Sequence, residues 1–188
     1  MRKELILKSA INVFKSKGLD GATMDEIAQN AGFGKATLYY YFKSKEEIFN
    51  SILLHGWNVI WESIEDDIVG DESPRRKFIK IIKNITELVN NDRPLYEFLF
   101  YAPQTLDKQT GTEPAWKEYQ QKLYNTLLHL IQTGIEKKQF PQMEPRIVLK
   151  ALGGVFHGMV FWGKDSGDIT EEQIEEMLDN LLGRNKSE

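Results

Sequence analysis

The sequence of 188 residues contains no cysteine. This absence excludes disulfide bonds, thiolate nucleophiles and cysteine-ligated metals, and no sign of an oxidising compartment is left. No apolar run approaches the roughly 20 residues that a membrane-spanning helix needs, and the amino-terminal stretch lacks the continuous apolar core of a secretory signal. Hydrophobic residues make up 41% and charged residues 28%, as in folded, water-soluble proteins. We therefore expect a cytoplasmic, globular protein.

Catalytic motifs are missing as well. Only three histidines are present, His55, His129 and His157, and none has the spacing of a zinc-binding HExxH motif. The chain has no GxxxxGKS/T phosphate loop, no GxSxG elbow and no glycine pattern of a dinucleotide-binding fold. Adjacent acidic residues such as Asp66 and Asp67 diverge on a helix, which is typical of a solvated surface. The sequence predicts no metal site, no cofactor and no enzyme, and an enzyme is kept as the alternative from a different class.

Charge is unevenly distributed, although the formal net charge is only −4. Residues 1–50 contain eight lysine and arginine residues against six acidic ones, whereas the remainder contains 16 against 22. A mildly basic amino-terminal segment followed by an acidic body indicates two parts with different partners.

Apolar residues recur with the period of an α-helix along the chain, and no segment alternates with the period of two that a strand requires. The fold class is therefore predicted to be all-α, with about nine helices. Three capping boxes (Thr23 with Glu26, Ser44 with Glu47, Thr170 with Gln173) and a Ser73–Pro74 pair mark helix starts. The predicted helices cover residues 3–16, 24–31, 35–41, 44–67, 73–91, 94–101, 112–138, 147–162 and 170–181.

The connection between the second and third helices is very short. Only Gly32, Phe33 and Gly34 separate them. A helix, a glycine-containing turn of about three residues and a second helix form a helix-turn-helix. We predict a helix-turn-helix DNA-binding domain over residues 1–46 and a helical ligand-binding and dimerisation domain over residues 47–188.

The third predicted helix carries three consecutive tyrosines. Leu38 and Phe42 are four residues apart and are suited to pack on the first two helices. At about 100° per residue, Ala36 and Tyr40 then point away from the core. A tyrosine hydroxyl can bond a phosphate oxygen, and a small side chain lets the helix approach base edges. The helix is therefore predicted to read DNA, although partly buried packing of the tyrosines is the alternative.

Residues 3–50, and Thr23–Phe49 above all, resemble the amino-terminal domain of TetR-family transcriptional repressors. The resemblance covers about the first quarter of the chain. It implies a homodimer that places one recognition helix per subunit in successive major grooves of a near-palindromic operator, released when a small molecule binds the carboxy-terminal domain. The family pattern is matched at Thr23, Ile27, Ala28, Ala31, Gly32, Lys35, Thr37, Leu38, Tyr39, Tyr40, Phe42, Lys45, Glu46 and Glu47.

The resemblance also implies individual DNA contacts. Phosphate contacts correspond to Thr23, Tyr39, Tyr41 and Lys45, and contacts near the bases correspond to Lys35, Ala36, Thr37 and Tyr40. The chain departs from the family at two positions. Gly34 stands where serine or threonine often caps the recognition helix, and Tyr41 stands where histidine is common, which leaves that contact neutral at physiological pH.

Aromatic residues are numerous enough in the body to line a ligand cavity between helices. Filling of the core is the alternative for each of them. The predicted ligand is a largely apolar or aromatic molecule, with Tyr96, Tyr124, His129 or His157 as the polar anchor. The candidate ligand-binding residues are Trp57, Trp61, Tyr96, Phe100, Trp116, Tyr124, His129 and His157.

The segment ALGGVFHGMVFWG, residues 151–163, is apolar around most of its circumference and must be covered on several sides. Together with the last helix it is predicted to form a four-helix interface with a second copy of the chain. Close packing within one subunit is the alternative. The candidate interface residues are Gly154, Gly158, Phe161, Trp162, Ile174, Met177, Leu178 and Leu181.

These features together predict a homodimeric, ligand-responsive repressor of transcription that binds double-stranded DNA. The long fourth helix begins beside the predicted DNA contacts and continues into the body, so it is the expected route of coupling. A constitutive DNA-binding factor without a ligand switch is the alternative within the same class.

Overall fold

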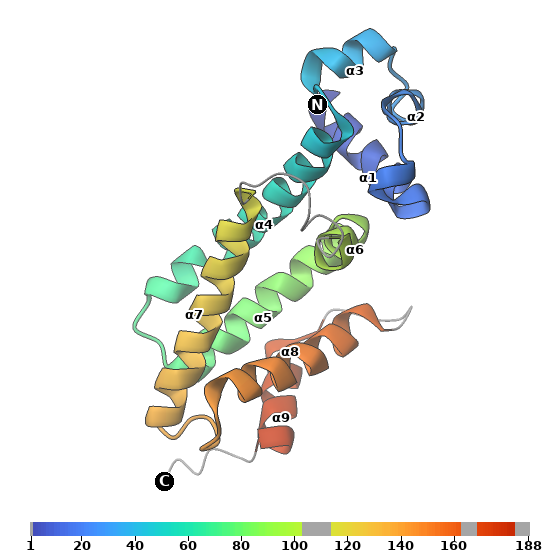
Figure 1. Ribbon diagram of the computed structural model, residues 1–188. Helices are drawn as coiled ribbons and strands as arrows, with labels where there is room; N and C mark the ends of the chain where they lie inside the picture. The colour runs from blue at the N-terminus through green and yellow to red at the C-terminus, as the bar shows by residue number, and fades with distance from the viewer. Residues whose placement is uncertain (1, 103–113, 163–168, 183–188) are drawn as a thin grey trace. The chain divides into compact units, whose positions relative to one another are not determined.

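The computed structural model describes residues 2–102, 114–162 and 169–182. Within these ranges the chain forms nine helices and no strand, which confirms the predicted all-α class. The helices, shown in Figure 1, are α1 (Arg2–Gly21), α2 (Met24–Asn30), α3 (Lys35–Tyr41), α4 (Lys45–Val69), α5 (Pro74–Asn91), α6 (Arg93–Tyr101), α7 (Trp116–Glu136), α8 (Pro145–Phe161) and α9 (Glu171–Leu182). No helix in these ranges is both long enough and apolar enough to cross a membrane.

The predicted caps form with one variation. Thr23 and Glu26 make a complete capping box, and Thr170 and Gln173 exchange the same pair of hydrogen bonds. At the start of α4, Ser44 Oγ accepts a hydrogen bond from the Glu47 backbone N–H, but the Glu47 carboxylate accepts from the backbone N–H of Lys43 at 2.6 Å rather than from that of Ser44. The Glu47 carboxylate thereby binds Lys43, the residue that precedes the Ser44 cap.

Some helix ends differ from the prediction. The first helix does break at Gly18 as predicted, because its φ 69° and ψ 176° are not helical, and the bounds of α1 extend to Gly21 because a second, short helical stretch follows this residue. α8 begins at Pro145, two residues earlier than predicted, because the Glu144 carboxylate caps it by accepting from the Ile147 backbone N–H at 3.0 Å. The predicted start of α7 at Thr112 lies outside the described residues.

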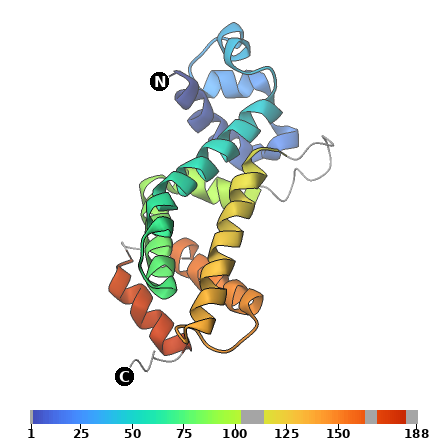
Figure 2. The ribbon, with the colours of Figure 1, turned by 90° about the vertical axis from the view of Figure 1, so that its left-hand side faces the viewer.

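The chain divides into two compact units. The first consists of Met1–Val59 and Asp92–Glu118, and the second of Ile60–Asn91 and Tyr119–Glu188. α4 is one uninterrupted helix that contributes to both units (Figure 2). The predicted domain boundary after residue 46 stays a prediction, and α6 belongs to the same compact unit as the helix-turn-helix.

The core of the first unit is aromatic. The ring of Phe49 on α4 lies 5.3 Å from that of Phe14 on α1 and 5.0 Å from that of Phe98 on α6. At the surface of the unit, Lys15 Nζ contacts Glu97 Oε2 at 2.6 Å, and this ion pair joins α1 directly to α6. The carboxylate is held ionised, because the hydrogen bond from Lys15 lowers the pKa of Glu97. α6 is therefore fixed to the helices that carry α2 and α3.

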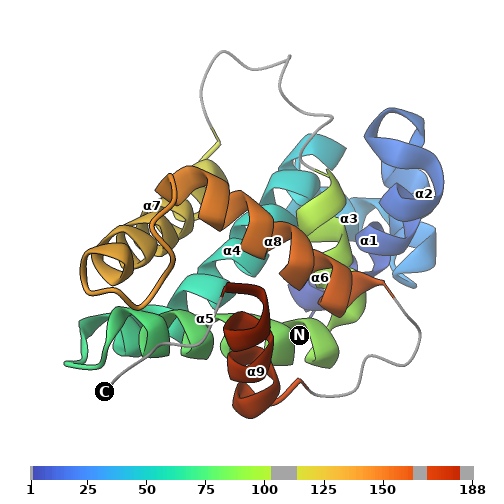
Figure 3. The same ribbon diagram turned by 90° about the horizontal axis from the view of Figure 1, so that it is seen from below.

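In the second unit, α5 packs against α8 and α9 (Figure 3). The buried Arg75 guanidinium joins three segments: it donates to Asp179 on α9 at 2.6 Å and to the Gln139 backbone carbonyl at 3.2 Å. The apolar core beside it contains Phe78, Ile79, Ile82, Ile131, Phe140, Val148, Leu149, Leu152, Ile174 and Leu178.

Candidate functional site

The connection from α2 to α3 depends on a glycine. Gly32 has φ 70°, a conformation that L side chains rarely adopt, and the next residue, Phe33, donates its backbone N–H to the Ala28 carbonyl at 2.9 Å. Gly34 then stands at the N-cap of α3 with extended backbone and no side-chain cap. The chain thus turns within three residues, and this places α3 directly after α2 as the helix-turn-helix prediction requires.

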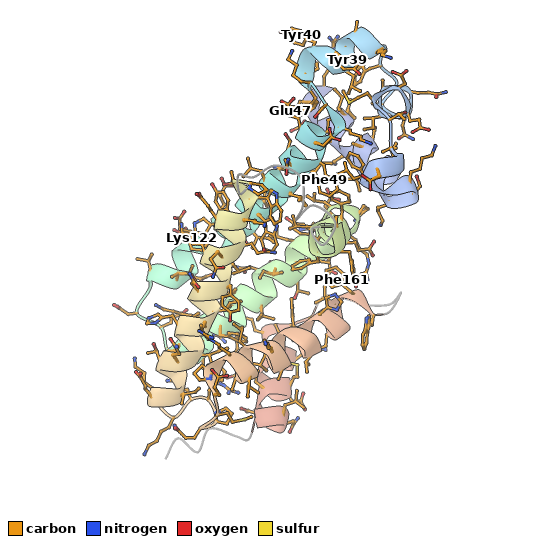
Figure 4. The ribbon with its side chains drawn as sticks, in the orientation of Figure 1. Tyr39, Tyr40, Glu47, Phe49, Lys122 and Phe161 are labelled. Carbon is orange, nitrogen blue, oxygen red and sulfur yellow. The ribbon has the colours of Figure 1, made fainter. Side chains whose placement is uncertain are left out.

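α3 buries one side and exposes the other. Leu38 and Phe42 are fully buried, whereas Ala36 is exposed and 77% of the Tyr40 side chain is accessible. Figure 4 shows Tyr39 and Tyr40 on this helix, and the rings of Tyr40 and Tyr41 meet edge to face at 5.1 Å. The predicted orientation of α3 is confirmed, and its solvent face offers hydroxyls and one methyl group.

Lys35, at the start of α3, is paired with Asp25 in the first turn of α2. Lys35 Nζ lies 2.8 Å from Asp25 Oδ1, and both side chains are more than half exposed. The hydrogen bond that Lys35 donates to the Asp25 carboxylate raises the pKa of Lys35. Sequence reasoning missed Asp25 because the two residues are ten positions apart and no helical spacing links them. The predicted base contact of Lys35 must compete with this carboxylate.

Lys45 is less free than the sequence suggested. Its Nζ donates to the carbonyl oxygens of Asp20 at 2.9 Å and Ala22 at 3.0 Å. These carbonyls lie on either side of the end of α1 at Gly21, where helical partners run out, so Lys45 ties the first turn of α4 to the α1–α2 connection. A lysine has three N–H donors, and one remains for the predicted phosphate contact.

Thr23 combines capping with exposure. Its hydroxyl accepts from the Glu26 backbone N–H at 3.3 Å, and the exposed hydroxyl proton can still be donated to a phosphate. Lys17 binds the Glu26 carboxylate and lowers the pKa of Glu26. The remaining predicted contact, Thr37, is half-buried in the middle of α3.

The predicted ligand-binding residues fall into two groups. The first unit contains Trp57, Tyr96, Phe100 and Trp116. Three of these side chains are buried, and the half-buried Phe100 ring meets that of Trp57 at 5.7 Å. Trp116 donates its indole N–H to Asn50 Oδ1 at 3.2 Å, and burial raises the pKa of Tyr96 to about 12. These four residues are called the aromatic cluster of the first unit; Trp57 lies on α4, Phe100 meets its ring, and Trp116 is bonded to Asn50 on the same helix.

The second unit contains Trp61, Tyr124, His129 and His157. Trp61 lies under the ammonium of Lys122, labelled on α7 in Figure 4, at 3.6 Å from the ring centroid. Tyr124 and His129 are exposed, and His157 stacks obliquely on Phe161 at 5.0 Å. These side chains do not form a cluster like that of the first unit.

Some of the predicted dimer-interface residues are buried within the protomer, and others are exposed. Ile174 and Leu178 are fully buried in the core of the second unit, so they pack against the chain's own helices rather than presenting a face to a second copy. Trp162 is 78% exposed and Leu181 is 56% exposed. Met177 and Phe161 are half-buried.

The glycines of α8 lie opposite its buried residues. At about 100° per residue, Gly154 and Gly158 share the side facing away from Val148, Leu149 and Leu152. A Cβ at Gly154 would meet nothing within 4 Å, so no packing within the chain requires glycine there. At Gly158 the same atom would lie 3.4 Å from the Trp162 ring.

Comparison with known proteins agrees with this geometry. Residues 6–52 match the profile described as "Bacterial regulatory proteins, tetR family", and residues 71–184 match "Tetracyclin repressor-like, C-terminal domain". The HTH-type negative transcriptional regulator IcaR of the Staphylococcus epidermidis biofilm operon icaADBC is 30% identical over 130 residues, which span 68% of this chain and 65% of that protein. The regulator YhgD of Bacillus subtilis, itself uncharacterised, is 25% identical over 95% of this chain and 93% of its own length.

Two solved structures have the same fold. A Clostridium perfringens protein named as a regulator of fatty acid metabolism has a TM-score of 0.73 and 29% identity, covering 96% of this chain and 98% of its own. AibR in complex with isovaleryl coenzyme A and operator DNA has a TM-score of 0.78 and 19% identity, covering 97% and 99%. Because the second profile alone covers more than half of the sequence, the chain belongs to the tetR family of bacterial regulatory proteins and is a DNA-binding regulator of transcription.

Proposed function

We propose that the protein is a homodimeric repressor that binds a near-palindromic operator through α3 and is released by a largely apolar or aromatic effector. The observation that carries this proposal is the two-sided α3, with Leu38 and Phe42 buried and Ala36 and Tyr40 open to solvent. Repression rather than activation is supported by the name of the staphylococcal relative, a negative regulator. The protein would act by binding, without catalysis, in the cytoplasm where its operator lies.

The proposed contacts divide by chemistry. Thr23, Tyr39, Tyr41 and Lys45 hold phosphates and set the position of the helix, whereas Lys35, Ala36, Thr37 and Tyr40 approach the bases. Gly34 lets the start of α3 come close to the duplex, because it adds no side chain at the N-cap. Neutral tyrosine hydroxyls supply several of these contacts, which explains how a chain of formal net charge −4 can bind DNA.

Dimerisation is proposed through α8 and the exposed part of α9. The outward side of α8 has Ile147 at 54% exposure, two glycines that allow close approach, and Trp162 at its end. Met177 and Leu181 extend this apolar surface on α9. Apolar surface of this extent on neighbouring helices is suited to a two-fold interface.

An apolar effector is supported by the aromatic cluster of the first unit and by two printed names. One neighbour is named for fatty acid metabolism, and another was solved with isovaleryl coenzyme A and operator DNA. α4 starts at Lys45, which contacts the α1–α2 connection, and continues to Val69. A shift of α4 would therefore move the helix-turn-helix, including α3, that is proposed to bind DNA. The α3 helices of the two proposed subunits must lie about 34 to 36 Å apart, or a multiple of this distance, to meet half-sites on one face of the duplex.

The proposal is tested by footprinting the purified protein on genomic DNA and repeating the binding with apolar, aromatic and cationic compounds. Protection of a near-palindrome that is lost with an apolar or aromatic compound is the expected result. Protection that no compound relieves would favour a constitutive DNA-binding factor. Absence of any protected sequence at low salt would contradict the proposed function altogether.

A further inference from the structure

Trp57 on α4 has a buried hydrogen-bond donor without a partner. Only 4% of its side chain is exposed, and no acceptor among the described residues binds its indole N–H. Within the described ranges, this nitrogen is the sole buried side-chain nitrogen or oxygen left without a hydrogen bond. Buried donors are nearly always satisfied in folded proteins, because leaving one unpaired forfeits its hydration.

The other buried tryptophan shows that the fold can satisfy such a group. Trp116 donates its indole N–H to Asn50 Oδ1 at 3.2 Å. Asn50 and Trp57 are seven residues apart on α4 and therefore lie on the same side of the helix. The unpaired donor of Trp57 thus contrasts with the bonded donor of the other buried tryptophan.

The surroundings of Trp57 are apolar. Its ring meets Phe100 edge to face at 5.7 Å, and Tyr96, one turn earlier on α6, is buried deeply enough to raise its pKa to about 12. Next to Trp57, a Cβ at Gly56 would lie 3.1 Å from the Leu99 side chain, so α4 and α6 are closely packed there. A hydrogen bond made in such an environment is strengthened by the low local dielectric.

The chemistry of the donor limits what can satisfy it. An indole N–H donates and cannot accept, so it binds an acceptor atom and discriminates against an ammonium group. It has no charge to offset the desolvation of a carboxylate. A neutral acceptor oxygen meets both conditions, and a carbonyl oxygen does so without bringing a donor that would itself need a partner.

We propose that the Trp57 indole N–H is the polar anchor of the effector site and that the effector has a neutral carbonyl group, as in a ketone, ester or thioester, on an apolar body. This inference rests on the proposed ligand response. It adds an anchor to those predicted from sequence, which are Tyr96 in the first unit and Tyr124, His129 and His157 in the second.

The test uses two matched series of probes that differ at one group: acetophenone, ethylbenzene and 1-phenylethylamine, and 2-nonanone, nonane and nonylamine. Release of the full-length protein from its footprinted operator is titrated for wild type, Trp57→Phe and Trp116→Phe. Wild type is expected to respond to the ketones at concentrations about 5- to 100-fold lower than to the hydrocarbons, and least to the amines. Trp57→Phe removes the donor and retains an aromatic ring, so its ketone preference should fall to about one, while Trp116→Phe keeps it.

Thermal unfolding without probes provides a second readout. Trp57→Phe and Trp116→Phe both remove ring volume from a buried site, but Trp116→Phe should unfold at the lower temperature, because it also leaves Asn50 without its partner, whereas Trp57→Phe removes an unpaired donor. An undiminished ketone preference in Trp57→Phe, or a loss of thermal stability as large as that of Trp116→Phe, would overturn the anchor while leaving the ligand response intact. If no probe releases DNA from wild type, both the anchor and the proposed response to this class of effector fail.

Discussion

Lys45 Nζ lies 2.9 Å from the carbonyl oxygen of Asp20, across the junction between the start of α4 and the end of α1. A residue expected to hold a phosphate therefore also holds the DNA-binding unit together. Charge-assisted hydrogen bonds to helix-end carbonyls satisfy groups that would otherwise need water. Substitution of Lys45 should therefore change both the stability of the fold and the binding of DNA.

Lys45→Ala should lower the free energy of unfolding by about 1–2 kcal/mol, because two hydrogen bonds from a charged donor are lost. It should also weaken binding to every duplex and reduce the salt slope of binding by about one, as expected for one lost phosphate contact. Lys43→Ala, at an exposed position nearby, is the control for stability. Urea unfolding and salt-dependent anisotropy measure the two effects, and an unchanged salt slope would leave Lys45 with the structural role alone.

Asp25→Asn should strengthen DNA binding by about 1.5- to 5-fold at low salt, since it releases Lys35 from an exposed surface ion pair. The gain should shrink as salt screens the pair. Combining it with Lys35→Met in a double-mutant cycle isolates the coupling between the two residues. If Asp25→Asn strengthens binding equally with and without Lys35, the carboxylate acts on the DNA directly and not through the lysine.

Tyr40→Ala should alter the preference among operator sequences while changing the free energy of unfolding by less than about 0.5 kcal/mol, because the side chain is mostly exposed. Leu38→Ala, on the opposite side of the same helix, should cost about 2–5 kcal/mol. Competition binding against a randomised half-site library reads the preference. A uniform loss across all sequences would assign Tyr40 to a phosphate.

Gly154→Leu should convert the proposed dimer into monomer or aggregate, because a side chain would stand between the two α8 helices of the proposed interface. Nothing in the protomer opposes the larger residue. Gly153→Leu is the matched control, since a Cβ there also meets nothing within 4 Å but points nearer to the flank of the helix. Sedimentation velocity distinguishes the species, and a stable Gly154→Leu dimer would place the interface elsewhere.

Alkaline pH should destabilise the protein through Tyr96. Burial raises the pKa of Tyr96 to about 12 from 10.0, so the folded state keeps a proton that the unfolded chain loses. Stability from this group is complete below about pH 10 and is lost as the pH rises toward 12, by about 3 kcal/mol in total. Tyr96→Phe should flatten that loss relative to wild type, whereas Tyr40→Phe, at an exposed site, should follow wild type. Urea midpoints between pH 9 and 12 provide the comparison.

Local patterns were sufficient for the secondary structure because helix starts depend on residues three or four positions apart. Thr23 with Glu26 and Thr170 with Gln173 predicted their caps correctly. Glu144 was missed because glutamate seldom caps a helix, although the following Pro145 was a usable signal. The orientation of α3 also followed from spacing, since burial of Leu38 decides where Ala36 and Tyr40 point.

The sequence by itself therefore determined the helices, the turn between α2 and α3, and the side of α3 that is open to solvent, because all of these depend on neighbours within about one helical turn. Contacts between distant residues were decided by tertiary structure alone. Lys45 with Asp20, Lys35 with Asp25, and the burial of Ile174 and Leu178 in the protomer core required knowing which helices pack together. The unpaired indole nitrogen of Trp57 was also decided by tertiary structure, because whether an acceptor lies nearby depends on which helices pack around Trp57.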